Sequence, residues 1–184
     1  MRLPAGAGGT LIHPSRAPGL VRTRWGLVGL VLFEAILAAY TLANGAWEYG
    51  AMALFAAAAL LWALAGHARE GTIPKAALAA LLAVTLWRAA RQTVLAPVFG
   101  PAGVWPTWLV PLGFALLLVP GLRPAIGLGA VAAARTWFVL WYVLQGSVTL
   151  ALANLVGAVG AWLWWSGESA PERPAPADET APQP

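Results

Sequence analysis

The sequence contains no cysteine, and this absence excludes several kinds of chemistry. Without thiols the chain cannot exchange disulfides, ligate an iron–sulfur cluster or build a thiolate metal site. Histidine is almost as scarce, because His13 and His67 are the only two and both fall outside the long apolar runs. A haem held by two histidines inside a membrane is therefore not expected, and we predict no metal site and no cofactor.

Charged residues are also few, at 10% of 184 residues, whereas ordinary soluble domains carry about a quarter. Hydrophobic residues make up 60% of the chain, and the mean hydropathy is +0.71. Such a chain cannot cover a globular surface with polar groups, but a lipid bilayer removes that need. The composition predicts an all-α, polytopic integral membrane protein with the lipid bilayer as its main partner. Membrane orientation explains the net charge of +4 better than nucleic-acid binding does, so no nucleic-acid partner is expected.

Six apolar segments follow one another, each near the ~20 residues that cross a ~30 Å hydrocarbon core. Short stretches of glycine, proline and polar residues separate them. We expect transmembrane helices at about 25–43, 48–66, 76–96, 105–120, 125–145 and 147–165. Residues 1–24 are predicted to form a flexible basic arm, and the acidic Pro/Ala-rich tail 166–184 to be disordered. The first span also resembles a signal peptide, but its length and Glu34 argue against cleavage, so we treat it as a transmembrane helix.

The basic residues outside the spans all fall on one side of this six-span arrangement. Cytoplasmic loops of membrane proteins carry an excess of lysine and arginine, so this asymmetry predicts that both termini are cytoplasmic. We expect the protein in the plasma (inner) membrane, as a multi-pass protein. The residues are Arg2, Arg16, Arg22, Arg24, Arg69, Lys75, Arg123 and Arg173.

Four charged residues lie inside apolar runs: Glu34 and Arg135 near mid-span, Arg88 slightly outward, and Arg91 one turn further out. A charge at the centre of a bilayer costs about 2.5–3.5 kcal/mol even on the mildest insertion scale. Arginine does not lose its proton inside a protein, so the buried charges must be paired with opposite charges, be hydrated or serve a function. Within the spans there are three arginines and a single acid, Glu34, or two acids if Glu48 reaches inward. Positive charge is left over, and a guanidinium fork suits a carboxylate or phosphate.

Polar residues in the third and fifth spans recur at helical spacing, which places them on single faces. Lipid cannot solvate these faces, so we expect both to point into the bundle, together with Asn154 of the last span. Trp87 and Trp137 lie beside the arginines and are predicted to wall a pocket with Tyr142. The two stripes are Thr85, Arg88 and Gln92 on the third span and Arg135, Phe138 and Tyr142 on the fifth.

Three interpretations of the buried charges stay open: ion pairs that only lock helices together, a site for an anionic ligand, and contacts with acids of another membrane protein. No nucleophile stands near a base, so no catalytic residue is predicted, and the sequence favours a non-enzymatic protein without excluding an enzyme.

The leading hypothesis is a pocket in the middle and outer half of the bilayer that binds or transports a small anionic or amphiphilic solute. The alternative is an accessory or structural subunit of a larger membrane complex, and a homo-oligomer is also open. The hypothesised ligand-binding residues are Glu34, Trp87, Arg88, Arg91, Gln92, Arg135, Trp137, Tyr142 and Asn154.

Overall fold

A computed structural model describes residues 17–95 and 101–169 of the chain. This part is all helical, as predicted. Its elements are α1 (Ala17–Ala43), α2 (Trp47–Glu70), α3 (Lys75–Ala90), the π-helical turn η2 (Arg91–Leu95), α4 (Pro101–Leu118), α5 (Pro124–Leu144) and α6 (Val148–Glu168). Four helices are long and apolar enough to cross a membrane, and Gly103–Leu118 is a shorter apolar helix. These features are compatible with a membrane protein. The four segments are Gly19–Ala43, Trp47–Glu70, Pro124–Leu144 and Val148–Glu168.

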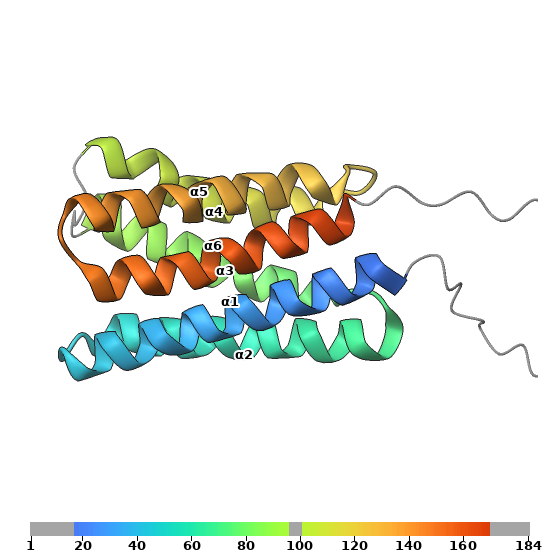
Figure 1. The fold of residues 1–184 in the computed structure, drawn as a ribbon, viewed down its shortest axis with the longest axis horizontal. Coiled ribbons are helices and arrows are strands. Elements are labelled where there is room, and N and C mark those ends of the chain that lie inside the picture. Colours follow the sequence, from blue (N-terminus) through green and yellow to red (C-terminus); the bar gives the residue numbers. More distant parts are fainter. Residues whose placement is uncertain (1–16, 96–100, 170–184) are drawn as a thin grey trace, which may run out of the picture.

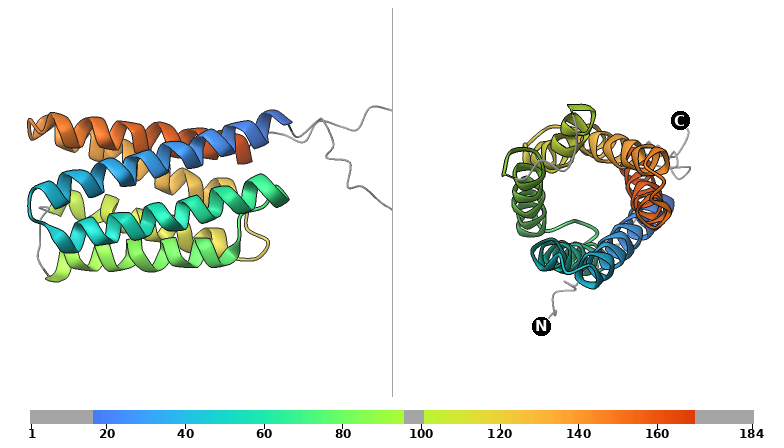
Figure 2. Two further views of the ribbon diagram at one scale, coloured as in Figure 1. Left: turned by 90° about the horizontal axis from the view of Figure 1, so that it is seen from below. Right: turned by 90° about the vertical axis from the view of Figure 1, so that its left-hand side faces the viewer.

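The helices form a closed ring rather than a layered bundle. Each packs against its neighbours in sequence, and α1 packs against α6 to close the circle, as the axial view in Figure 2 shows. Short connections make consecutive helices antiparallel. The start of α1 and the end of α6 therefore lie at the same end of the ring (Figure 1). Among the described residues, the backbones of opposite helices do not approach each other, so only side chains reach the centre of the ring.

The contact that closes the ring is a glycine seam between α1 and α6. A methyl group added at Gly29 would lie 2.9 Å from the Cα atom of Gly160, so the two backbones touch at this crossing. Near the helix ends, the hydroxyl of Thr23 donates to a carboxylate oxygen of Glu168 at 3.3 Å. This packing explains why α1 begins at Ala17, before the expected span start at residue 25. It also explains why α6 continues to Glu168, into the region expected to be tail.

The remaining parts of the predicted arm and tail lie outside the described residues. Residues 1–16 and 170–184 are not described, nor are residues 96–100, which include the first half of the predicted break between the third and fourth spans. The fourth helix begins at Pro101, earlier than the expected residue 105.

The third span differs from the expected continuous helix over 76–96. Regular α-helix ends at Ala90, and the π-helical turn Arg91–Leu95 follows. Within this turn the hydroxyl of Thr93 donates back to the carbonyl of Ala89 at 2.7 Å and accepts a hydrogen bond from the Trp108 indole at 3.1 Å. Arg91 is the first residue of this turn.

Candidate functional site

Glu34 and Arg88 form a buried, two-pronged ion pair between α1 and α3. Both terminal nitrogens of the guanidinium donate, one to each carboxylate oxygen, at 3.1 and 2.9 Å. Glu34 is 2% exposed and Arg88 is 8% exposed. Fork-to-fork pairing of this kind is among the strongest hydrogen-bonded ion contacts. Arg88 therefore balances the charge of Glu34 and links α1 to α3, two helices whose backbones do not touch.

Arg135 of α5 joins this pair but is held less completely. One terminal nitrogen donates to Glu34 at 3.3 Å, on an oxygen that Arg88 already uses. Its guanidinium carbon lies 4.0 Å from the ring centroid of Phe33, a cation–π contact. Its Nε is buried and has no hydrogen-bond partner among the described residues. The cluster thus holds two cations against one anion, with a donor left over on Arg135.

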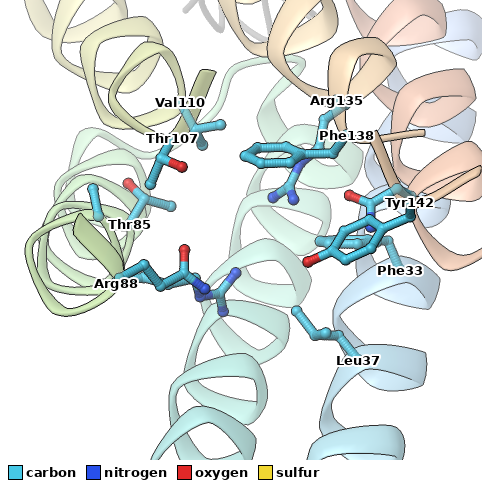
Figure 3. Close-up of a pocket in the computed structure, with 12 residues that line it drawn as sticks. Phe33, Leu37, Thr85, Arg88, Thr107, Val110, Arg135, Phe138 and Tyr142 are labelled. Carbon is cyan, nitrogen blue, oxygen red and sulfur yellow. The ribbon is translucent and has the colours of Figure 1, made fainter. Parts of the chain in front are cut away.

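The two arginines face a common cavity inside the ring, with an empty volume of about 520 Å³ that includes its open mouth. Figure 3 shows the side chains of Arg88 and Arg135 converging on this space from opposite walls, with the Tyr142 hydroxyl directed toward it. Glu34 does not line the cavity. The cavity therefore meets two guanidinium groups, while their shared carboxylate sits behind them. We call this space the anion cavity. Its lining is Phe33, Leu37, Thr85, Arg88, Ala89, Gln92, Thr107, Val110, Arg135, Phe138, Tyr142 and Asn154.

The two stripes predicted from the sequence converge on the anion cavity. All six of their residues line it, three from the third span and three from α5, and Asn154 of α6 completes the polar part. The hydroxyl of Thr85 donates to the Leu81 carbonyl at 2.7 Å, and the amide nitrogen of Asn154 donates to the Leu150 carbonyl at 2.9 Å. Both side chains are thereby held against their own helices beside the arginines.

Arg91 lies away from the cavity. Its Nε donates to both carboxylate oxygens of Glu48 on α2, each at 3.1 Å, and the two side chains are 29% and 44% exposed. Arg91 opens the π-helical turn η2 and has its own acid, so Glu48 does not reach the buried cluster.

Trp87 and Trp137 are also absent from the lining. They are 51% and 41% exposed. Consecutive residues on a helix do not face the same way, so each tryptophan points outward while Arg88 beside Trp87, and Phe138 beside Trp137, point in.

Two walls of the cavity were not expected from the sequence. On α1, Phe33 and Leu37 lie four residues apart and flank Glu34, a helical spacing that could have revealed them. On α4, Thr107 and Val110 line the cavity, and Thr107 is a buried hydroxyl in an otherwise apolar helix. Thr107 donates to the Gly103 carbonyl at 2.8 Å.

Comparison of the chain with protein-family models, with curated proteins and with solved structures finds no match. Within residues 17–95 and 101–169, no three histidine, aspartate or glutamate side chains gather in a way that could hold a metal ion. Two buried guanidinium groups, an aromatic wall and a few fixed polar groups are suited to holding an anion with an apolar body.

Proposed function

We propose that this chain is a multi-pass membrane protein that binds a small organic anion, with an apolar body, in the anion cavity. One observation carries the proposal: two buried arginines line one cavity and share one carboxylate that lies outside its lining. An oxyanion between them would balance the charge and give the Nε of Arg135 a partner. Phe138 and the ring of Tyr142 would cover the apolar part of the ligand.

In this proposal all six helices cross the bilayer. From Trp25 to Ala43 α1 rises ~27 Å, close to a ~30 Å hydrocarbon core. Large exposed tryptophans stand near both ends of the ring, Trp25 and Trp162 at one and Trp47 and Trp105 at the other, as expected for interfacial belts.

The described basic residues outside the buried cluster and Arg91 stand at the end where α1 begins and α6 finishes. We therefore place that end, with both termini, on the cytoplasmic side of the plasma (inner) membrane. They are Arg22, Arg24, Arg69, Lys75 and Arg123. The anion cavity then lies in the middle and outer half of the bilayer.

The competing interpretations fit the geometry less well. An accessory subunit would present its arginines to acids of a partner, but Arg88 and Arg135 are buried inside the ring, at 8% and 7% exposure. A purely structural ion pair needs only one arginine for Glu34. Arg88 already fills this role, because both of its terminal nitrogens donate to the carboxylate. Arg135 adds a second cation to a cluster that is already neutral, which a structural role does not require.

Thermal unfolding of the purified protein tests the proposal with a matched set of probes. Benzenesulfonate combines an anion with an aromatic body, acetate lacks the body, and benzyl alcohol lacks the charge. A ligand at 100 times its dissociation constant stabilises the folded state by about 2.7 kcal/mol. We expect the largest rise in melting temperature with benzenesulfonate, and its loss in Arg135→Gln. An equal rise in wild type and Arg135→Gln, or no rise with any anion, would contradict the proposal.

A further inference from the structure

A second cavity lies inside the same ring, at its opposite end. Its empty volume is about 560 Å³, and residues of α2, α3, α4, α5 and α6 surround it together with the α2–α3 loop. The anion cavity is likewise surrounded by α1, α3, α4, α5 and α6. Because five of the six helices line each space, both lie within the ring. We call the second one the basal cavity; its lining is His67, Gly71, Thr72, Ile73, Leu78, Leu117, Pro124, Leu128, Trp164 and Glu168.

One layer of apolar side chains separates the two cavities, and three helices repeat the same spacing across it. On α3, Leu78 lines the basal cavity and Thr85 the anion cavity, with buried Leu81 between them. On α5, Leu128 and Arg135 take these two places on either side of Val131.

The antiparallel α4 has the same order, with Leu117 at the basal cavity, Val110 at the anion cavity and Phe114 between. On all three helices the separation is two turns, or ~10 Å. We call Leu81, Phe114 and Val131 the apolar layer; they are 1%, 4% and 1% exposed and belong to one buried cluster.

We infer that the ring encloses a transport path for the anion, closed in this structure by the apolar layer. The inference rests on the proposed anion binding and adds the route. A narrow apolar layer excludes water and ions, so it can act as a gate between the two cavities. The path runs from the anion cavity, past Leu81, Phe114 and Val131, into the basal cavity. Glu168 lines that cavity and accepts a hydrogen bond from Thr23, and the basic residues Lys75 and Arg123 stand at the same end of the ring, outside the lining.

α4 is the helix best suited to open this gate. Pro106 and Pro111 both lie inside it, about two turns and one turn from Phe114 respectively, on the side of the anion cavity. Each proline removes a hydrogen bond of the helical ladder, so α4 is easier to bend there than its neighbours. Bending at Pro111 would move Phe114 relative to Leu81 and Val131. A path through the ring thus needs one helix to move, while the Glu34–Arg88 pair keeps α1 and α3 together.

Flux measurements in liposomes test the gate, with benzenesulfonate as the probe because it stays ionised and does not cross lipid unaided. Phe114→Ala removes the largest side chain of the layer, and Leu112→Ala on the exposed face of α4 is the matched control. We expect Phe114→Ala to release trapped benzenesulfonate roughly tenfold faster than the control, since widening a dry constriction lets water and ions enter. Equal release by the two variants would overturn the path.

The two proposals fail in different ways in this experiment. If benzenesulfonate stabilises wild type and Phe114→Ala alike but Phe114→Ala releases it no faster than Leu112→Ala, the site stands and the path is wrong. If benzenesulfonate stabilises neither protein, the binding proposal itself is wrong. The stabilisation of Phe114→Ala by the probe also shows that the variant is folded.

A second measurement does not depend on Phe114 and uses the absence of cysteine from the chain. Single cysteines at Thr85, Leu81 and Leu78 sample the anion cavity, the layer and the basal cavity. A membrane-impermeant thiol reagent is applied to intact cells and to inverted membrane vesicles. We expect Thr85→Cys to react from one side, Leu78→Cys from the other and Leu81→Cys most slowly. Reaction of Thr85→Cys and Leu78→Cys from the same side, or of either from no side, would overturn the path.

Discussion

Arg88 donates hydrogen bonds to Glu34 from both terminal nitrogens of its guanidinium, whereas Arg135 donates only one to the same carboxylate, at 3.3 Å. This difference in hydrogen bonding indicates different roles for the two arginines. Arg88 serves the fold, because it satisfies the buried acid and joins α1 to α3. Arg135 keeps an unused donor beside the cavity, and in the binding proposal it is the residue that meets the ligand.

Replacing each arginine by glutamine should separate these roles. Hydrogen bonds to charged groups contribute about 1.5–3 kcal/mol each, so Arg88→Gln should lower the free energy of unfolding by about 2–3 kcal/mol more than Arg135→Gln. Arg135→Gln leaves a complete Glu34–Arg88 pair and should fold nearly as well as wild type. Unfolding midpoints in detergent measure both. Equal destabilisation by the two substitutions would mean that Arg135 is as structural as Arg88.

Glu34→Gln should be the most damaging change in the cluster, and an anion should repair it. Removing the acid leaves two buried cations without a counter-charge, which costs about 3–5 kcal/mol. Benzenesulfonate should stabilise Glu34→Gln more than it stabilises wild type, because it would supply the missing negative charge between Arg88 and Arg135.

Glu48→Gln is the matched control, since this acid also pairs with an arginine but lies outside the cavity. It should show the same response to benzenesulfonate as wild type. A rescue of Glu34→Gln no larger than that of Glu48→Gln would contradict anion binding at the cluster.

The Arg91–Glu48 pair should matter little to stability. Both side chains are partly exposed, and such pairs contribute about 0–1 kcal/mol. In a double-substitution cycle of Arg91→Gln and Glu48→Gln, the coupling should be below ~1 kcal/mol and should shrink as salt is added. A coupling as large as that of Glu34 with Arg88 would show that the π-helical turn holds a second essential ion pair.

The sequence predicts which side chains share a face of one helix, but it does not predict which side chains of different helices pair. Thr85, Arg88 and Gln92 share a face because of the helical period, and the period is written in the sequence. Which arginine pairs with Glu34 is a tertiary matter, because Arg88 and Arg135 have the same local pattern. Trp87 and Trp137 were expected to line the cavity because they stand next to Arg88 and Phe138 in the sequence. Adjacent residues of a helix point to different faces, and both tryptophans are exposed.

The overall fold was likewise predictable in its helices but not in their packing. Composition and hydrophobic runs predict all-α structure with apolar helices, but not which helices meet. The closure of the ring depends on Gly29 lying against Gly160, and a glycine has no side chain to indicate its partner. The π-helical turn that carries Arg91 was missed because no residue type marks such a turn in advance.

The ring closure yields its own prediction. Gly160→Ala should lower the free energy of unfolding by about 1–3 kcal/mol, the usual effect of overpacking a close contact, because its methyl group would lie 2.8 Å from the carbonyl oxygen of Gly26. Gly129→Ala is the control, since its methyl group would lie 3.5 Å from the nearest Trp165 atom, an ordinary contact. If both substitutions are tolerated equally, α1 and α6 are not in such close contact.

The most direct test of the central claim is an experimental structure of the protein with 4-bromobenzenesulfonate, whose bromine can be located by anomalous scattering. The binding proposal predicts bromine density beside Phe138 in the anion cavity, with a sulfonate oxygen within hydrogen-bonding distance of the Arg135 Nε. Density only at the lipid-facing surface, or an Arg135 Nε paired with a residue of the chain instead, would contradict it.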